Sequence, residues 1–286
     1  MKFGLVPVNV GVKSIEQSIG LAQLAESVGF ESVWTFEHVM VPEDYASKYP
    51  YNADGKMGAK PETNFVDPLI ALTAVAANTR TLKLGTGVNI VSQSNPLLLA
   101  KQAASLDFVS GGRFMLGAGI GWLREEFDAM GVPFERRGAR FDDYMVAIKK
   151  VWSGEVVEHQ SDFLNWSGFK SYPIPRGESG IPMVIGGIKG KIYERVAAHG
   201  DGWFLPVDNA AALAQKLEPL AAACAAVGRD PGSVEISCMW DMQGGLEAIK
   251  AFEAVGASRV IVPLLALGKD PVAGISQFAE DIIDKL

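Results

Sequence analysis

The stretch from Leu82 to Trp122 reads LKLGTGVNIVSQSNPLLLAKQAASLDFVSGGRFMLGAGIGW, and its order of apolar runs and turn residues predicts the fold. Residues 82–90 form an apolar β run that breaks at Thr86-Gly87. Asn95-Pro96 then starts a helix, because proline suits the first helical turn. A second strand, residues 113–121, ends in glycines. The stretch therefore predicts a strand–helix–strand unit with glycines at both strand ends, where α/β proteins bind ligands.

The same alternation of strand and helix extends along the whole chain. We expect eight strands, at residues 2–10, 32–35, 82–90, 113–121, 181–185, 202–207, 234–240 and 259–265. We expect helices at residues 14–28, 67–78, 96–109, 122–130, 137–153, 192–198, 209–227, 245–255 and 271–285. The strands are apolar nearly throughout, as is typical when both faces of a parallel sheet are buried. The pattern predicts one (β/α)8 (TIM) barrel domain over residues 1–286, with a doubly wound open sheet as the alternative.

Two segments depart from this alternation. Residues 40–65 are rich in proline, glycine and tyrosine, and they predict a long loop after the second strand. A loop of that length in a compact domain is typically a lid or a binding loop. Residues 155–170 alternate loosely between polar and apolar side chains, which predicts a hairpin inserted before the fifth strand.

Composition excludes several classes of protein. The chain has 286 residues and a net charge of −7, and it shows no basic patch with interleaved aromatics, so we expect no nucleic-acid binding. Cys224 and Cys238 lack a partner at metal-ligand or redox spacing, which favours a reducing cytoplasm. The chain begins KFGLVPVNV after Met1, without a charged leader or an apolar run that could span a bilayer. We therefore expect a cytoplasmic protein that does not bind membranes.

Polar residues at the strand ends are the candidates for chemistry, because loops that follow barrel strands form the active face. His38 follows the second strand beside Glu37 and is a candidate general acid or base, since imidazole titrates near neutrality. A structural histidine bonded to a neighbouring loop is the alternative. Glu125-Glu126 is interpreted as a solvated or ion-paired helix terminus. Asn9, Asp208 and Asp241 also fall at strand ends, and His159 and His199 are interpreted as structural.

Two glycine-rich turns lie among these strand ends. Gly186-Gly187 precedes Lys189 and could bind a phosphate through free N–H groups and the lysine charge, or could simply let a short turn close. Gly117-x-Gly119-x-Gly121 lacks the dinucleotide spacing. We interpret this run as close approach of the backbone to a ring system, with tight barrel geometry as the alternative.

Missing motifs narrow the chemistry further. The three histidines are spread over the chain, which argues against a catalytic zinc, and we expect no metal. There is no lysine inside a late strand for a Schiff base, no Gly-x-Ser-x-Gly elbow and no P-loop. Trp34, Trp122 and Trp203 could line the mouth of the barrel, the open end at which its strands finish. A tryptophan in a barrel is more often part of the core. Such a mouth suits a flat, aromatic, phosphorylated ligand.

Three stretches carry a family resemblance: residues 67–131, residues 181–187 (IPMVIGG) with 194–203 (ERVAAHGDGW), and residues 32–42 (SVWTFEHVMVP). The chain resembles the bacterial luciferase-like superfamily over almost its whole length, and most of all its coenzyme F420-dependent oxidoreductases. The resemblance implies a deazaflavin F420, or alternatively FMN, with its ring in the barrel mouth. It also implies a small-molecule substrate and a homodimer, for which the apolar first two helices could supply the interface.

The resemblance also implies roles for particular residues. It implies a non-prolyl cis peptide at Gly87-Val88, a bulge that backs the cofactor ring, and Glu37-His38 as the acidic and histidine pair of the site. Further cofactor-binding residues implied in this way are Asn89, Gly119, Gly121, Gly186, Gly187, Ile188 and Lys189, the last four as the phosphate site.

One position departs from the family pattern. The F420-dependent glucose-6-phosphate dehydrogenases carry a catalytic glutamate after the fourth strand, where this chain has Trp122. This argues against a sugar phosphate and favours an apolar or aromatic substrate. Three functions remain open: an F420-dependent oxidoreductase, an FMN-dependent monooxygenase, and a barrel that binds such a cofactor without turnover.

Overall fold

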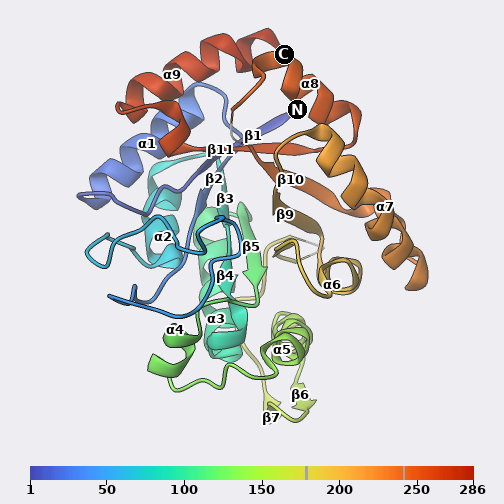
Figure 1. Cartoon of the computed structure of the whole chain (residues 1–286). Coiled ribbons are helices and arrows are strands. Elements are labelled where there is room, and N and C mark those ends of the chain that lie inside the picture. The colour runs from blue at the N-terminus through green and yellow to red at the C-terminus, as the bar shows by residue number, and fades with distance from the viewer. Residues whose placement is uncertain (178–179, 241) are drawn as a thin grey trace.

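A computed structural model describes residues 1–177, 180–240 and 242–286. Eight parallel strands pair in the order β1, β2, β3, β5, β8, β9, β10, β11, and β11 pairs again with β1 (Figure 1). Their bounds are β1 Lys2–Val6, β2 Ser32–Thr35, β3 Lys83–Thr86, β5 Phe114–Gly119, β8 Met183–Gly186, β9 Gly202–Pro206, β10 Glu235–Met239 and β11 Arg259–Pro263. The predicted (β/α)8 barrel is confirmed, and the open-sheet alternative is wrong, because the sheet closes on itself.

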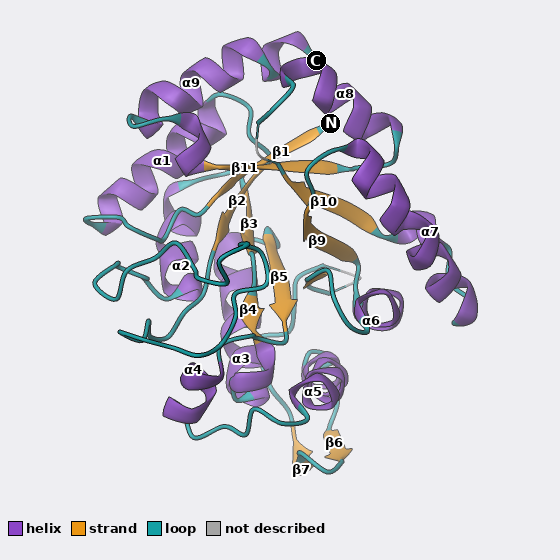
Figure 2. Ribbon diagram, in the orientation of Figure 1, coloured by secondary structure: helices purple, strands orange, loops and turns teal. Residues whose placement is uncertain are grey.

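Helices surround the barrel on its outer side (Figure 2). Their bounds are α1 Ile15–Ser27, α2 Pro68–Asn78, α3 Pro96–Ser110, α4 Arg124–Ala129, α5 Arg137–Val151, α6 Ile192–His199, α7 Ala210–Ala226, α8 Gly245–Ala254 and α9 Pro271–Asp281. The predicted starts of α2 and α3 are confirmed. Asp67 and Asn95 each accept two main-chain N–H bonds of the first helical turn, and a proline follows each cap.

A few predicted boundaries are wrong. β1 ends at Val6 rather than at residue 10, because Pro7 has no N–H for the ladder and Asn9 turns to bond Phe36 and Val66. β11 ends at Pro263, and residues 264–267 form a 3₁₀ turn where strand was expected. α9 likewise ends at Asp281, before a separate 3₁₀ turn at residues 283–285.

The two predicted insertions are present. β6 (Val157–Gln160) and β7 (Asn165–Phe169) form an antiparallel hairpin, which the His159–Asp143 hydrogen bond attaches to α5. Residues 40–65 contain no helix, and their one bridge joins Phe65 to Val10. This segment, called the long loop below, crosses in front of the strands in Figure 1.

The inside of the barrel is filled by side chains. Trp34 packs against Phe204 at 5.4 Å between ring centroids, and a Cβ on Gly85 would collide with the Trp34 ring. Arg259, fully buried, closes the N-terminal end through ion pairs with Glu31 and Glu235. Any site must therefore lie at the C-terminal ends of the strands, as in other barrels of this type. Among the described helices, none has the length and apolar character needed to cross a bilayer.

Candidate active site

The break predicted at Thr86-Gly87 is a bulge at the barrel mouth. The peptide bond between Gly87 and Val88 is cis, as the resemblance implied, and β4 (Asn89–Ile90) then pairs with β5. The Val88 side chain lies between β5 and β8. A Cβ on Gly119 or on Gly186 would lie 2.5 Å from a Val88 methyl group. Both glycines therefore leave space for Val88, which forms an apolar floor at this point of the mouth.

Glu37 holds the segment that follows the bulge. One carboxylate oxygen accepts a hydrogen bond from Asn89 Nδ2 at 2.9 Å, and the other accepts from the Ile90 main-chain N–H. Burial raises the pKa of Glu37 to about 7, and the nearby Glu126 carboxylate adds to the effect. Asn89 is 2% exposed, and its Oδ1 has no hydrogen-bond partner among the described residues. The mouth thus contains a carboxyl group that titrates near neutrality and a buried acceptor without a donor.

His38 lies next to this segment. Its Nδ1 is 3.2 Å from Glu126 Oε2, and its ring meets the edges of Phe65 and Trp122 at centroid distances of 5.4 and 6.0 Å. The side chain is 12% exposed. Its Nε2 makes no hydrogen bond within the described part of the chain. One ring nitrogen is therefore engaged by a carboxylate, while the other is available for proton transfer.

Glu126 was not predicted as a site residue. Of the two interpretations of Glu125-Glu126, solvated or ion-paired, the ion-paired one holds for Glu126, which is 2% exposed and paired with His38. Glu125 instead accepts hydrogen bonds from the main-chain N–H groups of Ala46 and Ser47, at 2.7 and 3.2 Å. The two adjacent carboxylates thus attach two parts of the chain, the end of β2 and the long loop, to the first turn of α4.

Trp122 connects the mouth to the long loop. Its ring meets Tyr45 at 5.8 Å and Tyr49 at 5.1 Å, and Tyr49 meets Tyr51 at 5.3 Å. Burial raises the pKa of Tyr49 above its usual value, so it stays a neutral phenol. These rings form an aromatic wall beside His38.

Two of the three tryptophans predicted to line the substrate pocket do not. Trp34 and Trp203 have no accessible surface, so that prediction is wrong for both. Trp34 Nε1 donates to Ser32 Oγ inside the barrel, and Trp203 Nε1 donates to the Gly187 carbonyl at 2.8 Å. Their large rings fill barrel and turn interiors, as the core alternative anticipated.

The turn after β8 is partly used by the fold itself. Gly187 has φ 127° and donates its N–H to the Phe204 carbonyl at 3.3 Å, so this N–H is not free for a phosphate. Ile188 is half-buried, and Lys189 is exposed. The phosphate site at this turn therefore stays a prediction.

The glycine at 121, after β5, is explained by packing. Gly121 has φ 75° and faces Phe127, whose ring would lie 2.6 Å from a Cβ at this position. A side chain at this position would thus collide with the Phe127 ring.

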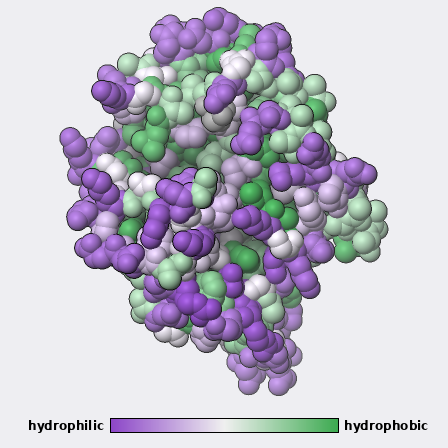
Figure 3. All heavy atoms as spheres, viewed as in Figure 1, coloured by the Kyte–Doolittle hydropathy of each residue, from purple (hydrophilic) through white to green (hydrophobic). Residues whose placement is uncertain are grey.

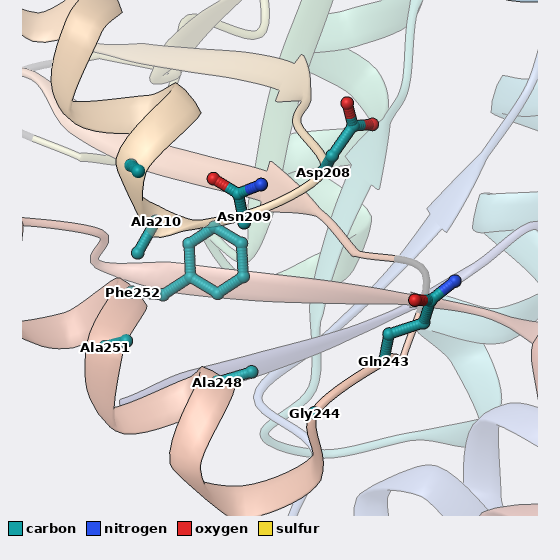
Figure 4. Close-up of a pocket in the computed structure, with 9 residues that line it drawn as sticks. Asp208, Asn209, Ala210, Gln243, Gly244, Ala248, Ala251 and Phe252 are labelled. Atoms are coloured by element: carbon teal, nitrogen blue, oxygen red, sulfur yellow. The ribbon is translucent and has the colours of Figure 1, made fainter.

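Figure 3 shows hydrophobic side chains gathered toward the middle of this face, inside a hydrophilic rim. A hollow of about 740 Å³ lies at the edge, between α7 and α8 (Figure 4). Among the described residues, its lining includes Asp208, Asn209 and Phe252 but no lysine or arginine, so it does not suit a phosphate. Asp241 lies outside the described residues. Within the described ranges, no group of three His, Cys, Asp or Glu side chains is arranged to hold a metal ion.

Comparison with known proteins identifies the class to which this barrel belongs. Residues 2–240 match the model of the luciferase-like monooxygenases, so the chain belongs to that family and is an oxidoreductase. An uncharacterized protein of Mycobacterium tuberculosis is 30% identical, over 73% of this chain and 74% of its own length. The 5,10-methylenetetrahydromethanopterin reductase of Methanolobus tindarius is 28% identical, over 86% of this chain and 66% of its own length.

Two solved structures share the fold. The coenzyme F420-dependent tetrahydromethanopterin reductase of Methanopyrus kandleri superposes with a TM-score of 0.79, at 16% identity and over 99% of each chain. The monooxygenase RslO1 of Streptomyces bottropensis gives a TM-score of 0.74, at 22% identity, over 100% of this chain and 99% of that one.

Proposed function

We propose that this protein is an F420-dependent oxidoreductase that transfers a hydride between the deazaflavin and a small apolar or aromatic substrate. The observation that carries the proposal is the placement of His38, with a free Nε2, in the mouth that also contains the Val88 floor. The name of the Methanopyrus kandleri structure supports F420 as the cofactor. The alternative is an FMN-dependent monooxygenase, which the fold shared with RslO1 favours.

The residues of the mouth fit a flat ring system. Val88 offers an apolar surface without a charged group, and the buried Asn89 Oδ1 is an acceptor that lacks a donor, such as a ring N–H would supply. In this proposal Val88 backs the ring, and the turn from Gly186 to Lys189 holds the phosphate. When bound, the deazaflavin supplies or accepts a hydride. Family membership argues against the third reading, a barrel without turnover.

The protein itself handles the proton and excludes water. If the substrate is oxidised, neutral His38 accepts a proton at Nε2; if it is reduced, the imidazolium returns one. Trp122, Tyr45 and Tyr49 cover the side of the mouth nearest His38 with aromatic surface. This wall favours an apolar or aromatic substrate and keeps water from the transfer.

We also propose that the protein is a homodimer formed through α2 and α3. Ile70, Leu98, Phe108 and Val109 are 52–66% exposed on these helices, which pack against each other. The sequence predicted an interface on the first two helices. The exposed apolar side chains favour α2 and α3 instead. A second copy of the same face would bury these side chains symmetrically.

A titration of the protein with F420 and with FMN, followed by fluorescence, tests the cofactor. We expect saturable binding of F420 and much weaker binding of FMN. Tight FMN binding without a response to F420 would overturn the proposal. His38→Ala should lower turnover by roughly 10²–10⁴-fold, the usual contribution of a general acid or base, with F420 affinity changed little. Unchanged turnover would return His38 to a structural role.

A further inference from the structure

The strongest unexplained feature of the mouth is the buried carboxylate of Glu126. Its side chain is only 2% exposed, so its pairing with His38 differs from an ordinary ion pair on the surface. Oε1 accepts hydrogen bonds from the main-chain N–H groups of Val39 and Met40, at 2.5 and 3.4 Å. Oε2 lies 3.2 Å from Nδ1 of His38. A carboxylate buried to this degree requires such donors, and all of them come from three consecutive residues after β2.

This arrangement decides which ring nitrogen of His38 carries the proton. An ionised carboxylate accepts hydrogen bonds and cannot donate them, so Nδ1 must be protonated to bond Oε2. In the neutral imidazole the lone pair then lies on Nε2, the nitrogen without a partner in the described structure. Glu37 does not take this role, because both of its oxygens are bonded to the segment after the bulge.

We propose that Glu126 is a positioning residue for His38: by accepting the Nδ1 proton, it keeps Nε2 as the nitrogen that exchanges a proton with the substrate. The inference rests on the proposed function, to which the proton role of His38 belongs. In the oxidising direction the substrate proton passes to Nε2 and an imidazolium forms. Glu126 accepts the Nδ1 hydrogen bond before and after this transfer and stabilises that cation. Its bonds to Val39 and Met40 fix the carboxylate, so the imidazole cannot rotate without losing its acceptor.

Glu126→Gln tests the inference sharply. The amide carbonyl oxygen of the variant keeps the bonds to Val39 and Met40, so its NH₂ group faces Nδ1 and requires that nitrogen to be an acceptor. The proton therefore moves to Nε2. We expect kcat with F420 to fall roughly 100-fold or more, toward the ~10⁴-fold limit of a general acid or base, while KM changes only a few-fold.

Imidazole ¹⁵N NMR above neutral pH reads the tautomer directly, and the chain has only three histidines. In the wild-type protein without cofactor, we expect His38 to be protonated at Nδ1, and in Glu126→Gln at Nε2. Glu125→Gln is the matched control: it alters the adjacent carboxylate, which binds Ala46 and Ser47, and should leave the His38 tautomer at Nδ1.

Three outcomes overturn the inference: a wild-type His38 protonated at Nε2, an unchanged tautomer in Glu126→Gln, or a switched tautomer with unchanged kcat. If the variant does not fold, the wild-type spectrum alone decides, because only the Nδ1–H tautomer is compatible with the role of Glu126. The spectra need no cofactor. A protein that fails to bind F420 would thus refute the proposed function while the tautomer result stands.

Discussion

Glu37 links the chemistry of the mouth to its architecture. Its two oxygens hold Asn89 and Ile90, the residues that carry the chain back into the sheet after the bulge. The same burial that makes these bonds strong also disfavours the ionised carboxylate, which is why its pKa rises to about 7. The residue that fixes the floor of the site is therefore half-protonated at neutral pH.

This raised pKa predicts a pH-dependent stability. The folded-state pKa, about 7, lies above the ordinary value of 4.5, so the folded protein binds the proton more tightly than the unfolded chain. The contribution of Glu37 to stability is complete below pH 4.5 and is lost as the pH rises through 7. Glu37→Gln should remove this loss, on the order of 1–3 kcal/mol, because a side-chain amide does not ionise.

Urea unfolding of both proteins between pH 5 and pH 8 measures the effect. The stability of Glu37→Gln relative to wild type should increase over this range. The Asn89 amide can turn to present its unpaired Oδ1 to the amide of the variant, which should therefore fold. Parallel stability curves for the two proteins would show that Glu37 does not titrate near neutrality.

At the scale of elements, the long loop is attached to α4 rather than free. The Glu125 carboxylate accepts from Ala46 and Ser47, the Ser47 hydroxyl accepts from the Arg124 N–H, and Trp122 packs on Tyr45 and Tyr49. These contacts join the loop to the segment just after β5. The loop thus takes its position from the same short segment that bonds His38.

Glu125→Ala should loosen this loop. Loss of two charge-assisted hydrogen bonds, each worth about 1.5–3 kcal/mol when buried and less at this partly exposed site, should raise amide exchange in residues 43–51. Hydrogen–deuterium exchange measures this, and we expect KM to rise several-fold while exchange in β2 stays unchanged. Equal exchange of the loop in variant and wild type would indicate that the aromatic contacts alone hold it.

Local signals explain why the elements could be predicted. Asp67-Pro68 and Asn95-Pro96 carry both the cap and the proline that start a helix. The Glu126–His38 pair could not be found in this way, because 88 residues separate the partners and no periodicity joins them. Similarly, composition does not tell whether Trp34 points into the closed barrel or out of its mouth.

At the scale of the whole molecule, a single substitution that introduces a charge tests the proposed dimer interface. Ile70→Glu places a carboxylate in the middle of the apolar surface of α2 and α3, and burying it in an interface would be costly. Light scattering after gel filtration should show a dimer for wild type and a monomer for the variant. Leu265→Glu is the control, since Leu265 is 92% exposed outside these helices and should leave the dimer intact. A wild-type monomer would refute the proposed interface.

The two ends of the barrel differ: the N-terminal end is closed by buried ion pairs, and the C-terminal end carries the candidate site. The N-terminal end is closed by Arg259, whose fully buried guanidinium bonds Glu31, Glu235 and Ser237. The C-terminal end carries the bulge, the histidine and the long loop. Changes to the aromatic wall at Trp122 are therefore separated from the ion pairs that close the other end.

The fit of Val88 between Gly119 and Gly186 has a consequence for how this site can evolve. A methyl group at either glycine would collide with a Val88 methyl at 2.5 Å, so the three positions are tied together. Random libraries that change one of them at a time should return mainly inactive clones. Only combined libraries, in which residue 88 shrinks as residue 119 or 186 grows, should give access to a mouth of new shape. Among related proteins, substitutions at these three positions should therefore occur together.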